Sequence, residues 1–147
     1  MTAVAHQAHV PASIQIRVDE SMPRFLVAIR GPVTGQKVAH ALAAYYLAHP
    51  EVIQLDMLFD LSVYEGAVEA DHVKIIVDAY LSCDPDPLHP CRTAFVTPDK
   101  NFRLWAAAMS FQFRGREHQA FATTEEADVW LGEPMNRRPP FQAPAAV

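Results

Sequence analysis

The sequence predicts an α/β domain with a five-stranded, mostly parallel sheet, and three observations lead to that prediction. Stretches of strand length alternate with stretches of helical periodicity through residues 13–132. The first two strand-like stretches are joined by a very short link, which predicts an antiparallel hairpin. The later strands are separated by helix-length segments, which implies right-handed crossovers between parallel strands. We therefore expect an N-terminal hairpin and further parallel strands, with about four helices packed on the sheet.

The hairpin and a helix come first. Residues 14–20, IQIRVDE, alternate apolar and polar side chains, as a half-buried strand does. Residues 24–31, RFLVAIRG, form the second strand after the turn ESMP. After the break GPVTGQ, residues 35–48 present one apolar face of helical spacing, formed by Val38, Ala41, Leu42 and Tyr45. His49-Pro50 ends this helix, because the residue before a proline avoids the helical region.

A central strand and a second helix follow. Residues 52–61, VIQLDMLFDL, are largely apolar, which is typical of a strand covered on both faces. Asp71 is a favourable N-cap for the next helix. The apolar positions of that helix have amphipathic spacing and are Val73, Ile76, Val77, Tyr80 and Leu81.

The C-terminal part repeats the alternation. Residues 92–98 form a short buried strand and residues 118–123 the last strand. Residues 102–113 between them form a helix whose core face is Phe102, Trp105, Ala106, Met109 and Phe113. Thr123 and Glu126 form a capping box for a final helix, which stops at Gly132.

Composition limits the function classes. The 147 residues fit one domain, predicted at residues 13–132 between a flexible segment at 1–12 and a flexible, proline-rich tail at 133–147. The net charge of -5 argues against a nucleic-acid partner, because such proteins need a basic face. No apolar run is long enough to cross a bilayer, so we expect no integral membrane span. The N-terminus does not resemble a secretory signal, which favours a cytoplasmic protein.

Three local sequences carry a family resemblance. They are GPVT at 31–34, LFDLSVYEG at 58–66 and AFATTEEADVWL at 120–131. Their order and spacing over residues 14–132 resemble the SpoIIAA-like, STAS-fold family of small bacterial proteins. This resemblance implies a five-stranded mixed sheet with an N-terminal hairpin. It also implies a regulatory or binding role, since STAS proteins include anti-sigma-factor antagonists, transporter regulatory domains and possible binders of nucleotides or lipids.

One feature of the antagonists is missing. In the family, a serine just after the central strand is phosphorylated at the start of the next helix. This chain has EADHV at 69–73 in that place, without a serine, and Ser62 lies too early. A phosphorylation switch of the family type is therefore not expected. Glu69 or Asp71 could imitate a permanently charged state, although helix capping explains Asp71 more simply.

Polar side chains at the carboxyl ends of the predicted strands form the candidate ligand-binding site. Ligands of open α/β sheets favour the crevice beyond these ends. Asp60, Ser62 and Tyr64 follow the central strand, and Asp99 and Lys100 follow the next one. Their alternative role is to cap loops and helices, which aspartates commonly do.

An enzyme is the less favoured class. The sequence contains no G-x-S-x-G motif, no glycine-rich phosphate loop and no H-E-x-x-H motif. We therefore predict no catalytic residue and no cofactor. The alternative is a small enzyme that uses Asp60 and Asp99 at the strand ends.

The predicted helix at 102–113 has a second apolar stripe opposite its core face, formed by Leu104, Ala108 and Phe111. An apolar stripe outside the core indicates a partner, a homodimer contact or an apolar ligand. Burial under the tail, beneath Met135 or Phe141, is the alternative.

The stretch CDPDPLHPC, residues 83–91, holds both cysteines and is interpreted as a stiff connector. A disulfide is less favoured in a cytoplasmic chain. Zinc ligation by Cys83, His89 and Cys91 with Asp84 or Asp86 is less favoured again, because the spacing matches no structural zinc pattern. We therefore predict no metal. The chain is predicted to be a non-enzymatic domain that acts through protein contact or by binding a small apolar or anionic ligand.

Overall fold

The computed structural model describes residues 10–134. Ten elements follow one another along this range: β1 (Ser13–Asp19), β2 (Arg24–Arg30), α1 (Gly35–Ala48), the 3₁₀ helix η2 (Pro50–Gln54), β3 (Asp56–Asp60), α2 (Ala70–Ser82), β4 (Cys91–Val96), α3 (Lys100–Met109), β5 (Arg116–Phe121) and α4 (Thr124–Leu131).

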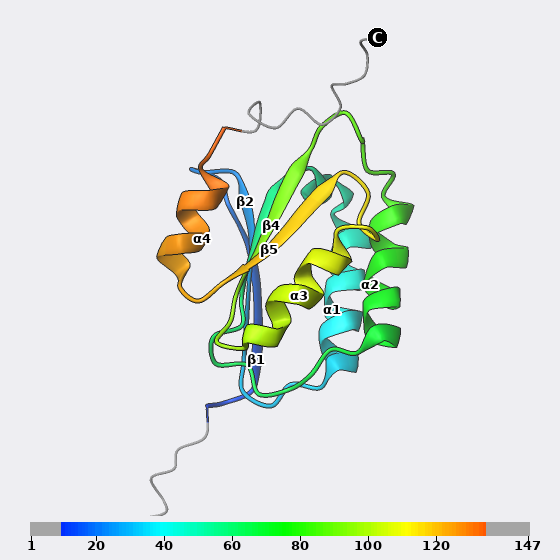
Figure 1. Ribbon diagram of the computed structural model, residues 1–147. Coiled ribbons are helices and arrows are strands. Elements are labelled where there is room, and N and C mark those ends of the chain that lie inside the picture. Colours follow the sequence, from blue (N-terminus) through cyan, green and yellow to red (C-terminus); the bar gives the residue numbers. More distant parts are fainter. Residues whose placement is uncertain (1–9, 135–147) are drawn as a thin grey trace, which may run out of the picture.

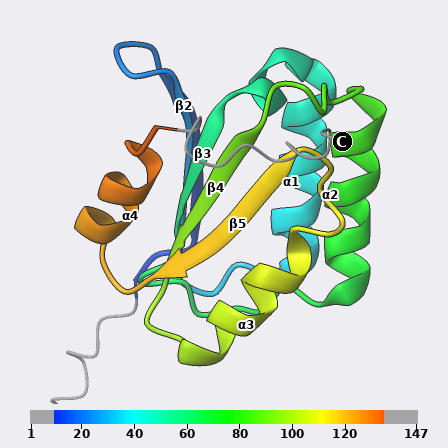
Figure 2. The same ribbon diagram turned by 45° about the horizontal axis from the view of Figure 1, so that its top comes forward.

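The five strands form one sheet in the order β1-β2-β3-β4-β5 (Figure 1). The β1–β2 pair is antiparallel, and the other three pairs are parallel. The hairpin and the mostly parallel sheet are therefore confirmed. Because the spatial order equals the chain order, each right-handed crossover places its helix on the same face. Figures 1 and 2 show α1, α2 and α3 together on that face and α4 alone on the other.

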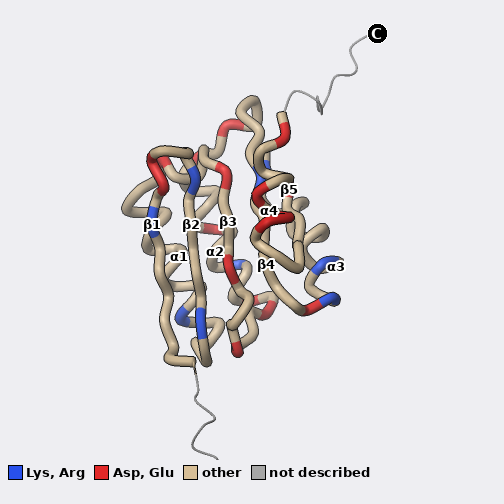
Figure 3. The backbone as a smooth tube through the Cα atoms, turned by 90° about the vertical axis from the view of Figure 1, so that its left-hand side faces the viewer, with Lys and Arg blue, Asp and Glu red and all other residues tan. Residues whose placement is uncertain are grey.

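The main core lies between the sheet and the three helices. Alternate residues of the strands point into it, including Val27, Ile29, Phe59 and Phe95. A second, smaller cluster lies under α4 and consists of Ala94, Val96, Ala127 and Leu131. The sheet therefore has a thickly covered face and a thinly covered one. Figure 3 shows the thin side, where α4 lies beside β4 and leaves β1 and β2 without a helix over them.

The central apolar run is shared between two elements, which corrects the predicted strand at 52–61. Pro50 begins η2, and the buried side chains of Val52 and Ile53 belong to that 3₁₀ helix. Only Asp56–Asp60 forms β3, with alternating buried and half-buried residues. Strand β3 is thus not fully covered on both faces. A short apolar run has no periodicity that separates a tight helical turn from a strand.

Other boundaries differ from the predictions by a few residues. Helix α2 has Glu69 as its N-cap, whose N–H donates to His72 Nδ1 at 3.0 Å, so Asp71 lies in the first turn and not at the cap. In that turn its charge still favours the helix dipole. Helix α3 ends at Met109. Strand β5 begins at Arg116, two residues before the predicted start.

The predicted flexible segments fall mostly outside the described residues, as do Met135 and Phe141, the tail residues expected to cover α3. Within residues 10–134, no helix has the length and apolar character needed to cross a membrane.

Candidate functional site

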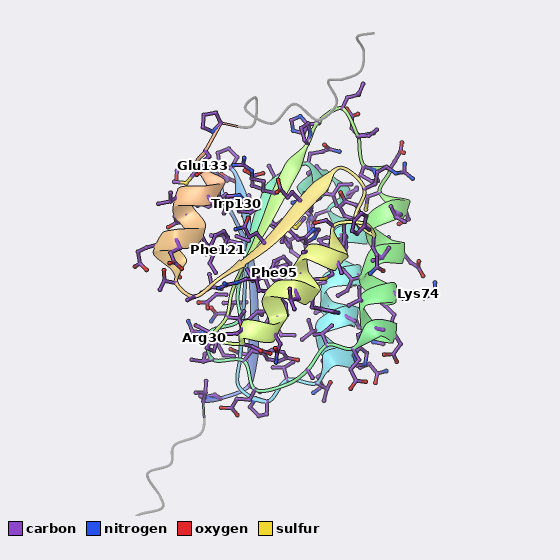
Figure 4. The ribbon with its side chains drawn as sticks, viewed as in Figure 1. Arg30, Lys74, Phe95, Phe121, Trp130 and Glu133 are labelled. Atoms are coloured by element: carbon purple, nitrogen blue, oxygen red, sulfur yellow. The ribbon has the colours of Figure 1, made fainter. Side chains whose placement is uncertain are left out.

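A cavity of about 470 Å³ lies between the helix-covered face of the sheet and helices α1, α2 and α3. Its walls are mainly apolar and aromatic, with Leu42 from α1, Ile76 from α2, and Phe102 and Trp105 from α3. Phe95 of β4 also lines it, on the α3 side of the sheet, as Figure 4 shows. Cavities of roughly 300–1,000 Å³ with such walls are typical of small-molecule sites.

Two loops at the carboxyl edge of the parallel strands line one end of this cavity, called its mouth because Gly66 and Asp99 are exposed there. The loop after β3 contributes Tyr64 and Gly66, and the loop after β4 contributes Thr97 and Asp99. The Tyr64 hydroxyl donates to the Val33 carbonyl at 2.9 Å, which fixes the ring against the β2–α1 loop. Ligands of open α/β sheets enter at this edge.

Arg116, at the start of β5, lies at the opposite end of the cavity. Its side chain donates to the carbonyls of Ile53 at 2.7 Å, Leu55 at 2.8 Å and Arg92 at 3.0 Å. It also donates to Thr93 Oγ1 at 3.0 Å. The residue is only 5% exposed, and its Nε is a buried donor with no hydrogen-bond partner in the described part of the chain.

The positive charge of Arg116 has no acidic partner among residues 10–134. The ion pairs of this range, at a limit of 4.0 Å, involve other cations. The guanidinium carbon also lies 5.8 Å from the centroid of the Tyr80 ring. Buried charges are normally paired, so this arrangement is unusual.

His118 lies two residues further along β5 and also lines the cavity. Ser110 Oγ accepts from the His118 backbone N–H at 2.9 Å and lies 3.5 Å from Nδ1. The Ser110 hydroxyl can donate to Nδ1 in the tautomer that carries the ring proton on Nε2. Nε2 has no hydrogen-bond partner within residues 10–134. Burial, reinforced by the Arg116 charge, lowers the pKa of His118 to about 3, so the ring is neutral at neutral pH.

The two tyrosines beside Arg116 are neutral as well. Burial raises the pKa of Tyr46 and of Tyr80. The Tyr80 hydroxyl donates to the Arg114 carbonyl at 2.7 Å, and the Tyr46 hydroxyl lies 3.5 Å from Met57 Sδ. A general base should titrate near the working pH, which none of these groups does. The cavity is thus better suited to holding a molecule than to transferring its protons.

The structure separates the predicted ligand-binding residues. Tyr64 and Asp99 line the mouth, and Asp99 also caps α3 by accepting from the Asn101 N–H at 2.9 Å. Asp60 and Ser62 do not line the cavity. Asp60 Oδ1 accepts from the Ser62 N–H at 3.0 Å and from its hydroxyl at 2.6 Å, which closes a local turn. Lys100 is exposed at the first position of α3 and does not line the cavity either.

The second apolar stripe of α3 faces outward. Leu104 is 78% exposed, Phe111 just beyond the helix is 92% exposed, and Ala108 is exposed too. A role for these residues in a partner or dimer contact stays a prediction.

The CDPDPLHPC stretch connects α2 to β4. Cys83 and Cys91 are free thiols that donate to backbone carbonyls of Tyr46 and Gln54. Burial raises the pKa of both cysteines. In the described range, no group of three His, Cys, Asp or Glu side chains is placed to hold a metal ion.

The sequence predictions missed Arg116 and His118. A signal was present, because REHQAF alternates and places Arg116, His118 and Ala120 on one face of the strand. All three are buried on that face.

Comparison with known proteins identifies a solved structure that shares the fold of this chain. No protein-family model and no curated protein matches the sequence. A similar solved structure is that of an uncharacterised DUF3478-family protein with a SpoIIAA-like fold from Shewanella loihica PV-4. The two chains are 15% identical, with a TM-score of 0.56, and the alignment covers 89% of this chain and 98% of that one. The chain therefore has the predicted SpoIIAA-like, STAS-type fold, and identity this low shows the fold alone.

Proposed function

We propose that this SpoIIAA-like domain binds a small apolar molecule in the cavity between the sheet and helices α1, α2 and α3. The single observation that carries the proposal is a cavity of about 470 Å³ with mainly apolar walls, whose lining includes loops at the carboxyl edge of the parallel strands. A domain of this size gains stability by filling such a space with side chains, because empty apolar volume costs packing energy. A retained cavity is therefore a reason to expect a ligand.

Binding is favoured over catalysis by the polar groups. Asp60 and Asp99, the pair named for an enzyme, both accept local backbone hydrogen bonds, and Asp60 does not line the cavity. Asp99 is exposed at the mouth, where water competes for its charge. His118 is a weak base because its pKa is about 3. These observations support a non-enzymatic binding domain.

The binding experiment uses Nile red, a neutral apolar dye whose emission rises in apolar surroundings. Val73→Phe places a larger side chain in the cavity from α2, since Val73 lines it and is only 4% exposed. Val129→Phe makes the same change on the outer face of α4, where Val129 is 67% exposed. Circular dichroism would first establish that both variants are folded.

We expect the native protein and Val129→Phe to bind the dye with equal affinity and Val73→Phe to bind it at least about tenfold more weakly. Equal binding by all three proteins would place the dye elsewhere, for example on the outer stripe of α3, and the proposal would be wrong.

A homodimer contact through the outer stripe of α3 is a second candidate function, because Leu104 and Phe111 are largely exposed. Sedimentation of the native protein and of Phe111→Glu tests it. A dimer that dissociates in Phe111→Glu supports the contact, and an unchanged mass removes this stripe from the interface.

A further inference from the structure

We propose that the molecule bound in the cavity is a carboxylate with an apolar body, and that its carboxylate lies at the Arg116–His118 end of the cavity. This inference rests on the proposed function and adds the chemistry of the head group. Three features support it: the unpaired charge of Arg116, the donor of His118 and the direction of the cavity.

The charge of Arg116 is the first feature. All four hydrogen bonds recorded for its guanidinium go to neutral acceptors, three carbonyls and the hydroxyl of Thr93. No carboxylate lies within 4.0 Å of it in the described part of the chain. The buried Nε is left without an acceptor. A buried cation of this kind is stabilised by an anion brought in from outside, because the attraction is strong where water is excluded.

His118 supplies the second feature. Its neutral ring carries one N–H, and in the tautomer with the proton on Nε2 it offers a donor while Ser110 Oγ lies 3.5 Å from Nδ1. Phe95 stacks on the ring at 5.9 Å between centroids, and Phe113 lies at 5.0 Å, so the imidazole is held in a fixed orientation. A neutral donor beside a guanidinium favours an anionic acceptor and adds no second positive charge.

The tyrosines and the cysteine near this end do not offset the charge. Tyr46 and Tyr80 are protonated, since burial raises the pKa of each. Cys91, whose pKa burial also raises, is a neutral thiol. The acidic residue that lines the cavity, Asp99, lies at the mouth. Among the residues that line the inner end of the cavity, Arg116 therefore carries the charge.

The direction of the cavity is the third feature. Arg116 pairs with Cys91 at the start of β4, whereas Thr97 and Asp99 at the mouth follow the end of that strand. The cavity thus extends along the strands from a positive inner end to the mouth. Apolar side chains of α2 and α3 line the length between them, including Ile76, Trp105 and Met109. A molecule with one anionic end and an apolar body matches this distribution.

The decisive experiment compares three molecules of equal chain length on the native protein at neutral pH. Decanoic acid, decanol and decylamine compete with Nile red for the cavity. We expect decanoate to bind about tenfold or more tightly than decanol, because hydrogen bonds between charged groups are stronger than those of a neutral hydroxyl. Decylamine should bind most weakly, since its ammonium group is repelled by Arg116. Decanol binding as tightly as decanoate would overturn the inference and leave the proposed function intact.

Two variants test the assigned residues. His118→Phe keeps a ring of similar size and removes the donor, so decanoate affinity should fall about three- to tenfold while decanol affinity stays within about twofold. Arg116→Met should abolish the preference for decanoate over decanol. If Arg116→Met does not fold, the ratio of the two affinities in the native protein and in His118→Phe still decides. A ratio unchanged by His118→Phe would remove His118 from the head-group site.

The failures of the two proposals are distinguishable. Dye binding that Val73→Phe does not weaken contradicts ligand binding in the cavity altogether. Dye binding that Val73→Phe weakens, together with equal affinities for decanoate and decanol, contradicts only the carboxylate head group.

Discussion

Two buried arginines lie on opposite faces of the same sheet, and their surroundings differ. Arg92 of β4 is 2% exposed under α4, and Arg116 of β5 is 5% exposed on the side of the three helices. Arg92 donates to the carbonyls of Trp130 at 2.6 Å and Glu133 at 2.9 Å, and its guanidinium carbon lies 5.0 Å from the Trp130 ring. Figure 4 shows Trp130 and Glu133 at the end of α4, over the sheet. Arg116 binds carbonyls of η2 and of the strand edge and lines a cavity.

The same residue type, arginine, therefore has a different role on each face of the sheet. Arg92 lies at the carboxyl end of α4, where a cation stabilises the last carbonyls and the helix dipole. Its charge therefore acts within the fold. The partners of Arg116 hold its guanidinium in place next to open volume, so its charge also reaches the cavity. A buried arginine thus indicates a binding site only where a cavity accompanies it.

Replacing the two arginines by methionine should give the largest effects. Arg116→Met removes four hydrogen bonds to largely buried acceptors, and Arg92→Met removes two of the recorded bonds at the end of a surface helix. At about 1 kcal/mol for each acceptor left without a partner, we expect losses of about 4 and about 2 kcal/mol in the free energy of unfolding. Urea unfolding measures both values.

The order of these losses is the informative result. A larger loss in Arg92→Met would mean that α4 contributes more to stability than the η2–β3 junction does. The arginine under α4 would then contribute more to the free energy of unfolding than the arginine beside the cavity.

The next effect is a pH dependence of stability from His118. Its pKa is about 3 in the folded protein and near 6.5 when unfolded, so the unfolded chain binds more protons between these values. The stabilisation is complete above the unfolded pKa and is lost as the pH falls toward 3. We expect this residue to lower the free energy of unfolding by about 1.4 kcal/mol per pH unit within that window.

Urea unfolding of the native protein and of His118→Phe at pH values on either side of 6 tests this dependence. The variant has no titratable ring, so its stability should fall less steeply on acidification. Equal slopes for the two proteins would mean that the folded protein binds the proton at His118 almost as readily as the unfolded chain.

The arrangement of the elements was predictable from the sequence because each strand and helix has a clear period. The alternation of Ile14, Ile16 and Val18 gave the first strand, and Thr123 gave the start of the last helix, where its side chain accepts from the Glu126 N–H. Short apolar runs were harder to assign to a helix or a strand. Val52 and Ile53 are as apolar as strand residues but belong to η2, since burial alone does not fix the backbone conformation.

Half of the cavity was predictable and half was not. The strand-end rule led to Tyr64 and Asp99 at its mouth. The inner end depends on Arg116, a residue type that is usually exposed. Its burial follows from three segments distant in sequence, which supply carbonyls from Ile53, Leu55 and Arg92. Only the packed tertiary structure brings those carbonyls together.

The smallest effect concerns the second attachment of α4. Arg24 of β2 donates to Asp128 of α4 at 2.8 Å, with side-chain exposures of 12% and 51%. A double-mutant cycle of Arg24→Gln and Asp128→Asn should give a coupling energy of about 0.5–1 kcal/mol, because the pair is partly shielded from water. The matched control is Lys74–Asp78 on α2, at a similar 2.9 Å but 74% and 63% exposed, where about 0.3 kcal/mol is expected. Coupling of Arg24 with Asp128 no larger than in this control would leave Arg92 as the main polar attachment of α4. The thinly covered face would then depend on its buried arginine as strongly as the cavity does on Arg116.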